Sequence, residues 1–115
     1  MNRLLALALS AAIGAGLSTT LIVPSAEAGS FRSHKNYKVS GTATKKGNKV
    51  TLSGFRTSSG PDLYVYVGKG SASRRVAKLR ANSGTQSYTL PAGDWTSVHI
   101  HCRKFNSTFG TASIR

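Results

Sequence analysis

Acidic residues and cysteine are both scarce in this sequence. The chain of 115 residues has three Asp and Glu residues and 16 Lys and Arg residues, and its formal net charge is +13. Such an excess attracts anionic partners, and the attraction weakens as salt is added. The chain has one cysteine, Cys102, which excludes both an internal disulfide and a Cys-x-x-Cys redox pair.

Motifs of known enzyme chemistry are also missing. The sequence has no Gly-x-Ser-x-Gly nucleophile elbow, no phosphate-binding loop and no Cys-His haem attachment motif. The Asp62 carboxylate is expected to pair with a cation or to bond to backbone amides, and Asp94 is expected to be a turn residue. We therefore do not predict that the domain is an enzyme by itself.

The N-terminal segment has the features of a secretory signal peptide. A positive start at Met1–Arg3 precedes an apolar stretch, residues 4–17, and the segment closes with Ala26-Glu27-Ala28. Small residues at positions −3 and −1 predict cleavage after Ala28, leaving residues 29–115 as one domain. An uncleaved membrane anchor is the alternative, which the interrupting Ser and Thr residues and the Ala-x-Ala ending disfavour. We expect a secreted, periplasmic or cell-surface protein with no transmembrane segment after cleavage.

Cleavage leaves the positive charge in place on a smaller body. It removes one basic residue, Arg3, and one acid, Glu27, so the net charge stays at +13. Because an exported protein rarely meets nucleic acid, we expect an anionic envelope polymer or a partner protein rather than DNA or RNA. The candidate anion-binding residues form two groups, one at a turn and one on a single strand face: Lys45, Lys46 and Lys49, and Arg74, Lys78 and Arg80.

Period-two alternation and frequent turn residues predict an all-β fold. We expect a small antiparallel β-sandwich or barrel of about seven short strands. Residues 29–36 form a lead-in segment, for which an edge strand around Phe31 is expected. The segment 74–80 fits either a strand or a short helix. The other predicted strands are residues 37–44, 50–55, 62–67, 86–90, 97–104 and 108–114.

Alternation in two of these strands divides their side chains between two faces. The apolar faces are predicted to hold Leu63, Val65 and Val67 in one strand and Val98, Ile100 and Cys102 in the other. The opposite faces hold Tyr64 and Tyr66, and His99 and His101. This pattern places Cys102 in the core, on the side away from both imidazoles.

Two strings in the sequence resemble one known family. The first is Gly60-Pro61-Asp62-Leu63-Tyr64-Val65-Tyr66-Val67, and the second is Cys-x-x-Phe-x-x-x-Phe-Gly, which runs from Cys102 through Phe105 to Phe109 and Gly110. In this order they resemble the DM-thirteen family, an extracellular all-β domain described as an electron-transfer domain and found beside DOMON domains. The resemblance covers essentially the whole chain after residue 28.

The resemblance implies a redox role for Cys102, either as a bare thiol or as a ligand to a prosthetic group such as haem. His34 also matches the family pattern. His101 departs from it, because the family usually has Trp just before the cysteine. The resemblance therefore makes Cys102, His34 and His101 the candidate cofactor-binding residues.

The same residues also have simpler interpretations. Cys102 is either a redox group or a packed core residue, since free cysteines are often buried. His99 and His101 lie roughly 7 Å apart by strand rise and hold a metal only if a third ligand, such as His34, reaches them. Otherwise they are a solvated pair. The two function hypotheses are thus a secreted redox domain centred on Cys102 and a basic binding module in which Cys102 is structural.

Overall fold

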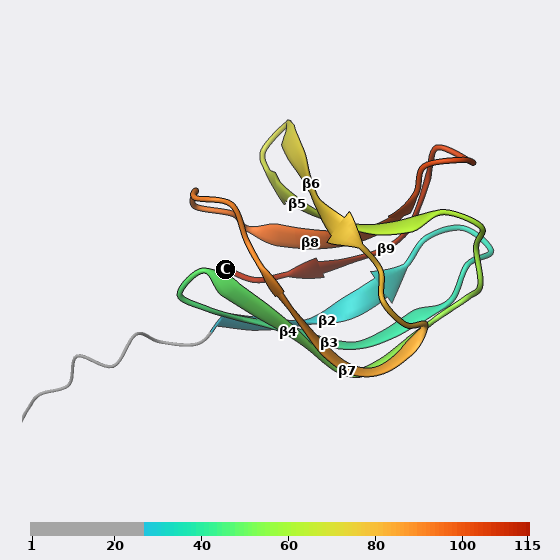
Figure 1. The fold of residues 1–115 in the computed structure, drawn as a ribbon, viewed down its shortest axis with the longest axis horizontal. Coiled ribbons are helices and arrows are strands. Elements are labelled where there is room, and N and C mark those ends of the chain that lie inside the picture. Colours follow the sequence, from blue (N-terminus) through green and yellow to red (C-terminus); the bar gives the residue numbers. More distant parts are fainter. Residues whose placement is uncertain (1–26) are drawn as a thin grey trace, which may run out of the picture.

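A computed structural model describes residues 27–115, which form one curled antiparallel sheet (Figure 1). The order across the sheet is β6-β5-β8-β9-β2-β3-β4-β7. The strands are β2 (Glu27–Ser33), β3 (Val39–Lys46), β4 (Lys49–Thr57), β5 (Leu63–Lys69), β6 (Ala72–Lys78), β7 (Ser83–Thr89), β8 (Ser97–Cys102) and β9 (Ser107–Ser113).

The sheet curls into a half-barrel, and its two edge strands, β6 and β7, contact each other. Alternate residues of a strand point inward, and the buried apolar side chains come mainly from β3, β4, β5, β8 and β9. The largest fully buried side chains come from four different strands and the C-terminal segment, and include Leu52, Phe55, Ile100, Phe109 and Ile114. The predicted all-β fold is confirmed, and segment 74–80 is a strand rather than a helix.

The lead-in segment was predicted wrongly as an edge. Residues 27–33 form β2, which lies inside the sheet between β3 and β9. Ser30 is paired with Thr42 of β3, and Phe31 is paired with Ala112 of β9. The described chain therefore has eight strands rather than about seven, because β2 joins the two halves of the sheet.

The predicted signal peptide lies almost entirely outside the described residues. The expected cut after Ala28 falls within β2, and Gly29 to Ser33 keep their register with β3 and β9 beyond it. Residues 27–115 contain no helix, and hence none with the length and apolarity needed to cross a bilayer.

Candidate functional site

Cys102 is completely buried at the end of β8. Its relative exposure is 0%, and it is opposite Leu63 of β5 and Ser107 of β9. The inward orientation predicted from alternation is confirmed, because Val98 and Ile100 are buried with it. The thiol is free, so no bond holds it to another residue.

The turn of residues 103–106 leads the chain out of β8 directly after Cys102. The Arg103 amide donates a hydrogen bond to the Asp62 carbonyl, at 3.0 Å, and the Asn106 amide donates one to the Arg103 carbonyl, at 3.1 Å. Asn106 has a φ of 49°, in the left-handed region that Asn tolerates better than most residues. The turn is therefore held by two backbone bonds and one strained residue.

A haem or metal on Cys102 does not fit this arrangement. The thiol lines none of three hollows on the surface of residues 27–115. It packs instead among apolar side chains, at 0% exposure. The imidazoles of His99 and His101 project from the opposite face of the same strand. A prosthetic group has no space beside the sulfur in this fold.

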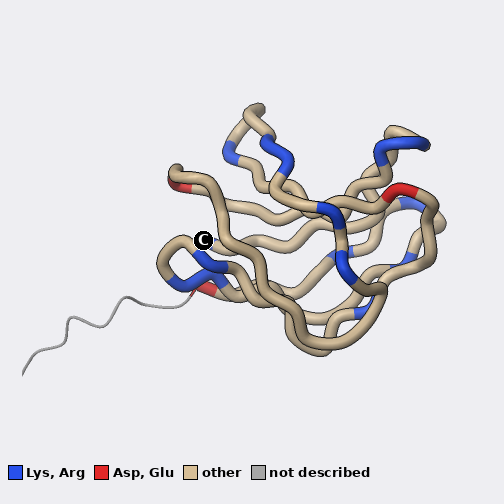
Figure 2. The backbone as a smooth tube through the Cα atoms, viewed as in Figure 1, with Lys and Arg blue, Asp and Glu red and all other residues tan. Residues whose placement is uncertain are grey.

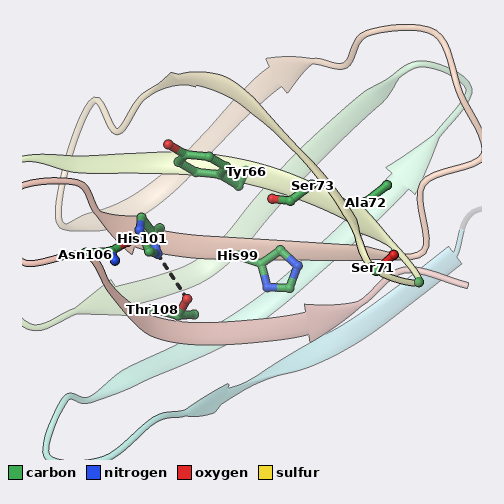
Figure 3. A pocket seen from close by; sticks show the side chains of 9 residues that line it. Tyr66, Ser71, Ala72, Ser73, His99, His101, Asn106 and Thr108 are labelled. Carbon is green, nitrogen blue, oxygen red and sulfur yellow. Dashed lines mark hydrogen bonds between the residues drawn. The ribbon is translucent and has the colours of Figure 1, made fainter.

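The outer face of the β5–β8 pair carries the tyrosines and histidines. Tyr64 is opposite His101 and Tyr66 is opposite His99. The Tyr66 and His101 rings meet edge-to-face with 5.2 Å between centroids. Beside them lies an open polar hollow of about 460 Å³. Figure 3 shows Tyr66, His99 and His101 around it, with the hydrogen bond from His101 to Thr108 dashed.

Two of the three histidines on this face, His34 and His99, are joined through one threonine. The Thr111 hydroxyl lies 3.0 Å from His99 Nδ1 and 3.0 Å from His34 Nε2. His99 Nε2 is 2.9 Å from the Ser97 hydroxyl. His34 thus approaches His99, but the Thr111 hydroxyl lies between the His34 and His99 rings.

The pKa of His99 is lowered from its ordinary value of 6.5. Burial is the main cause, because it disfavours the charged ring. The nearby His34 and His101 add smaller effects in the same direction, since each repels a second positive charge. His99 is therefore suited to a neutral role in the hydrogen-bond chain.

The predicted metal-binding pair, His99 and His101, has no third ligand beside it in the part of the chain that the structure describes. Among residues 27–115 no group of three or more His, Cys, Asp or Glu side chains is arranged to hold a metal ion. Both nitrogens of His99 already have hydroxyl partners, and Nδ1 of His101 bonds to Thr108. Both ring nitrogens of His99 and one of His101 are therefore engaged in hydrogen bonds to side-chain hydroxyls.

Cations surround Tyr64 on the same outer face. The charged ends of Arg75, Lys78 and Arg103 lie 5.4, 5.4 and 5.5 Å from the Tyr64 ring centroid. Lys78 also forms an ion pair with Asp62, at 3.6 Å, which confirms that this carboxylate is paired. We call these four residues, Tyr64, Arg75, Lys78 and Arg103, the Tyr64 cluster.

The predicted grouping of Arg74, Lys78 and Arg80 is wrong. A bulge at Val76 shifts the register of β6, so that Arg75 lies opposite Tyr66 and Arg74 opposite the buried Val67. The strand ends at Lys78, and Arg80 packs instead over the Tyr88 ring, 4.2 Å from its centroid. The bulge thus exchanges Arg74 for Arg75 on the face of Lys78.

The other predicted cationic group is kept together by a tight turn. Lys46 and Lys49 are opposite each other across the β3–β4 turn, and Lys45 precedes them. Gly47 supplies the positive φ, 62°, that the turn requires. Figure 2 shows Lys and Arg on this turn and on several other loops, with few Asp and Glu positions between them.

Several residues of the two family sequence strings have a structural role in this fold. Gly110 has no room for a side chain, because an added Cβ would lie 2.6 Å from Cβ of Val39. Phe109 is the extra residue of a bulge in β9, and its ring stacks on Tyr37 with 3.7 Å between centroids. A Cβ at Gly60 would come within 3.1 Å of both Leu63 and Phe109.

Phe105 differs from the other motif residues. It lies in the 103–106 turn and is 52% exposed, so it contributes little to the core. Pro61 and Asp62 begin the turn that leads into β5. The motif thus includes both packing residues and an exposed aromatic beside Cys102.

Three residues of this site were missed by sequence reasoning. Thr111 joins His34 to His99, while Arg75 and Arg103 complete the Tyr64 cluster. Nothing in the sequence pattern marked Thr111, because its role depends on β9 lying between β2 and β8.

These features define a small all-β domain with one buried thiol and a cationic, aromatic outer face. The family model described as "Electron transfer DM13" matches residues 30–114, nearly all of the described chain. The protein belongs to this family of electron-transfer domains, and a general role in electron transfer follows from the membership. No curated protein and no solved structure matches the chain.

Proposed function

We propose that the protein is an exported electron-transfer domain in which Cys102 is the redox group. One observation carries the proposal: Cys102 is the only sulfur-containing residue after residue 28. The chain belongs to a family that is described as an electron-transfer domain. The N-terminal signal features support an oxidising location outside the cytoplasm. An electron-transfer role also requires a redox partner that exchanges electrons with this protein.

A bare thiol is the form that this fold supports, since no prosthetic group fits beside the sulfur. The Cys102 thiol loses its proton to solvent and the thiolate attacks a disulfide of the partner protein. A new S–S bond joins the two proteins, and the second sulfur of the partner leaves as a thiolate with the electron pair. In this step the leaving sulfur of the partner is reduced to a thiolate and the Cys102 sulfur is oxidised to the mixed-disulfide level.

Burial requires that Cys102 be reached by local opening. The 103–106 turn is the element to open, because it follows Cys102 directly and is held by few bonds. Local openings of this kind cost less free energy than global unfolding. The reaction is then gated by the turn while the rest of the sheet stays folded.

Substitution at Asn106 tests this gate. Asn106→Ala adds about 1 kcal/mol of strain at a positive φ, which predicts about fivefold faster modification of Cys102 by a maleimide in native buffer. Gly47→Ala is the matched control, because it places the same strain in the β3–β4 turn, where an added Cβ meets nothing within 4 Å. Equal acceleration in both variants would mean that global unfolding, not the turn, exposes the thiol.

The alternative function is an anion-binding module with a structural Cys102. The pairing of Lys46 with Lys49 beside Lys45 favours it, since three like charges on one turn attract a polyanion. This function predicts salt-dependent retention on a sulfated matrix that Cys102→Ala leaves unchanged. Loss of retention in that variant, with the fold intact, would count against it.

A further inference from the structure

We propose that the Tyr64 cluster and Phe105 together form a docking surface for the acidic face of a partner protein. The surface is built from the start of β5, from β6 and from the 103–106 turn. The inference goes beyond the redox proposal, because it concerns binding and does not need Cys102 to react.

The positive charge on this surface is largely unneutralised. Three cations lie within 5.5 Å of one ring centroid, and over residues 27–115 only Lys78 among them has a carboxylate partner, Asp62. The quadrupole of Tyr64 offsets part of the repulsion. The guanidinium groups of Arg75 and Arg103 make no hydrogen bond to the described chain, so their N–H groups are free to bind carboxylates in pairs.

Phe105 adds an apolar anchor next to these cations. It is 52% exposed, and it is the one large hydrophobic side chain exposed among residues 27–115. Two positions separate it from Arg103 in the same turn, and the Arg103 amide is bonded to Asp62 at the start of β5. The exposed aromatic residue therefore lies in the same turn as one cation of the cluster, and that turn is bonded to the residue before β5.

This combination favours a protein over an anionic polysaccharide. Arg, Tyr and Phe are enriched at the centres of protein interfaces, where an aromatic side chain fills a pocket in the partner. A sulfated or phosphorylated polymer satisfies the cations but offers no apolar pocket for Phe105. The net charge of +13 on this chain favours an acidic surface on the partner protein.

The position of the surface also has a consequence for Cys102. Arg103 and Phe105 belong to the turn that follows the buried thiol, so a partner bound there lies against the element that must open. The surface is therefore placed where a redox partner is needed.

Binding to defined polymers tests the proposal. The probes are poly-L-glutamate, a copolymer of glutamate and tyrosine, and heparin, each titrated into the protein at fixed salt. The copolymer is expected to bind more tightly than polyglutamate, and Phe105→Ser is expected to remove that difference, about fivefold. The double variant Arg75→Gln/Arg103→Gln is expected to weaken copolymer binding about tenfold.

The matched control is Lys45→Gln/Lys46→Gln, which removes the same charge from the β3–β4 turn. Equal weakening by the two double variants would overturn the proposal, because net charge alone would then explain binding. Tighter binding of heparin than of the copolymer, with no effect of Phe105→Ser, would assign the surface to a polysaccharide instead. Cys102→Ala is expected to leave every affinity unchanged, so a failure of the redox proposal is seen separately.

Discussion

The two faces of the β5–β8 pair differ in burial and in chemistry. On the inner face, Leu63, Val65 and Ile100 pack with Cys102 at 5% exposure or less. On the outer face the same strands carry two tyrosines and two histidines, and the cations of the Tyr64 cluster lie against Tyr64 from β6 and from the 103–106 turn. The redox candidate and the candidate binding residues are thus separated by one sheet, and the 103–106 turn is where the chain passes from one to the other.

This difference assigns separate tasks to the two faces. The inner face stabilises the fold and shields the thiol, while the outer face presents charge and hydrogen-bonding groups to a partner. Substitutions on the inner face should therefore change stability, and those on the outer face should change binding or pH dependence. Each prediction below tests one side of that division.

The largest expected effect is on the inner face. Ile100→Ala removes a fully buried side chain and should lower the free energy of unfolding by about 3 kcal/mol. His101→Ala, next to it on the outer face, should lower it by about 1 kcal/mol or less. Chemical denaturation of both variants checks the contrast. Similar losses would show that the outer face is also part of the core.

The next largest loss of stability is expected from substitutions of Cys102. Cys102→Ser places a hydroxyl at a position of 0% exposure among apolar neighbours, and should cost about 2 kcal/mol of stability. Cys102→Ala leaves a small cavity and should cost about 1 kcal/mol. A serine variant as stable as the wild type would mean that a polar partner or water is present beside the sulfur.

The smallest effect is the pH dependence set by His99. Its pKa is lowered by burial and by the positive charges of His34 and His101, so the unfolded chain takes up this proton more readily than the folded one. As pH falls through 6.5, the unfolded-state value, stability should fall, and the loss should level off below the folded pKa. Above pH 6.5 the His99 ring makes no contribution to the pH dependence of stability.

Thermal unfolding across this pH range measures the effect. His99→Gln should remove this part of the pH dependence, and His34→Gln should reduce it by removing one repelling charge. An unchanged pH profile in His99→Gln would assign the dependence to other groups.

The separation of the two faces was predictable from the sequence. Alternation in residues 62–67 and 97–104 placed Cys102 inside and His99 and His101 outside, because period two is a local property of a strand. The family strings then predicted an electron-transfer domain, which the family match confirms. Long apolar side chains such as Ile100 made these two strands easy to recognise.

What the sequence missed depends on contacts between distant segments. β2 contains Gly29, Ser30 and Ser33 and shows little alternation, so its place inside the sheet comes from pairing with β9, far along the chain. The bulge at Val76 has no sequence signature and decides whether Arg74 or Arg75 joins the Tyr64 cluster. The link from His34 through Thr111 to His99 likewise exists only once β2, β9 and β8 are adjacent.

The most direct test of the central claim is the rate of Cys102 modification by a maleimide as a function of denaturant. Opening of the 103–106 turn exposes little surface, so the rate should be nearly independent of denaturant at low concentrations and should exceed the rate set by global unfolding. A rate that follows the full denaturant dependence of global unfolding from the lowest concentration would contradict the account, because Cys102 would then be a core residue that no partner reaches in the folded protein.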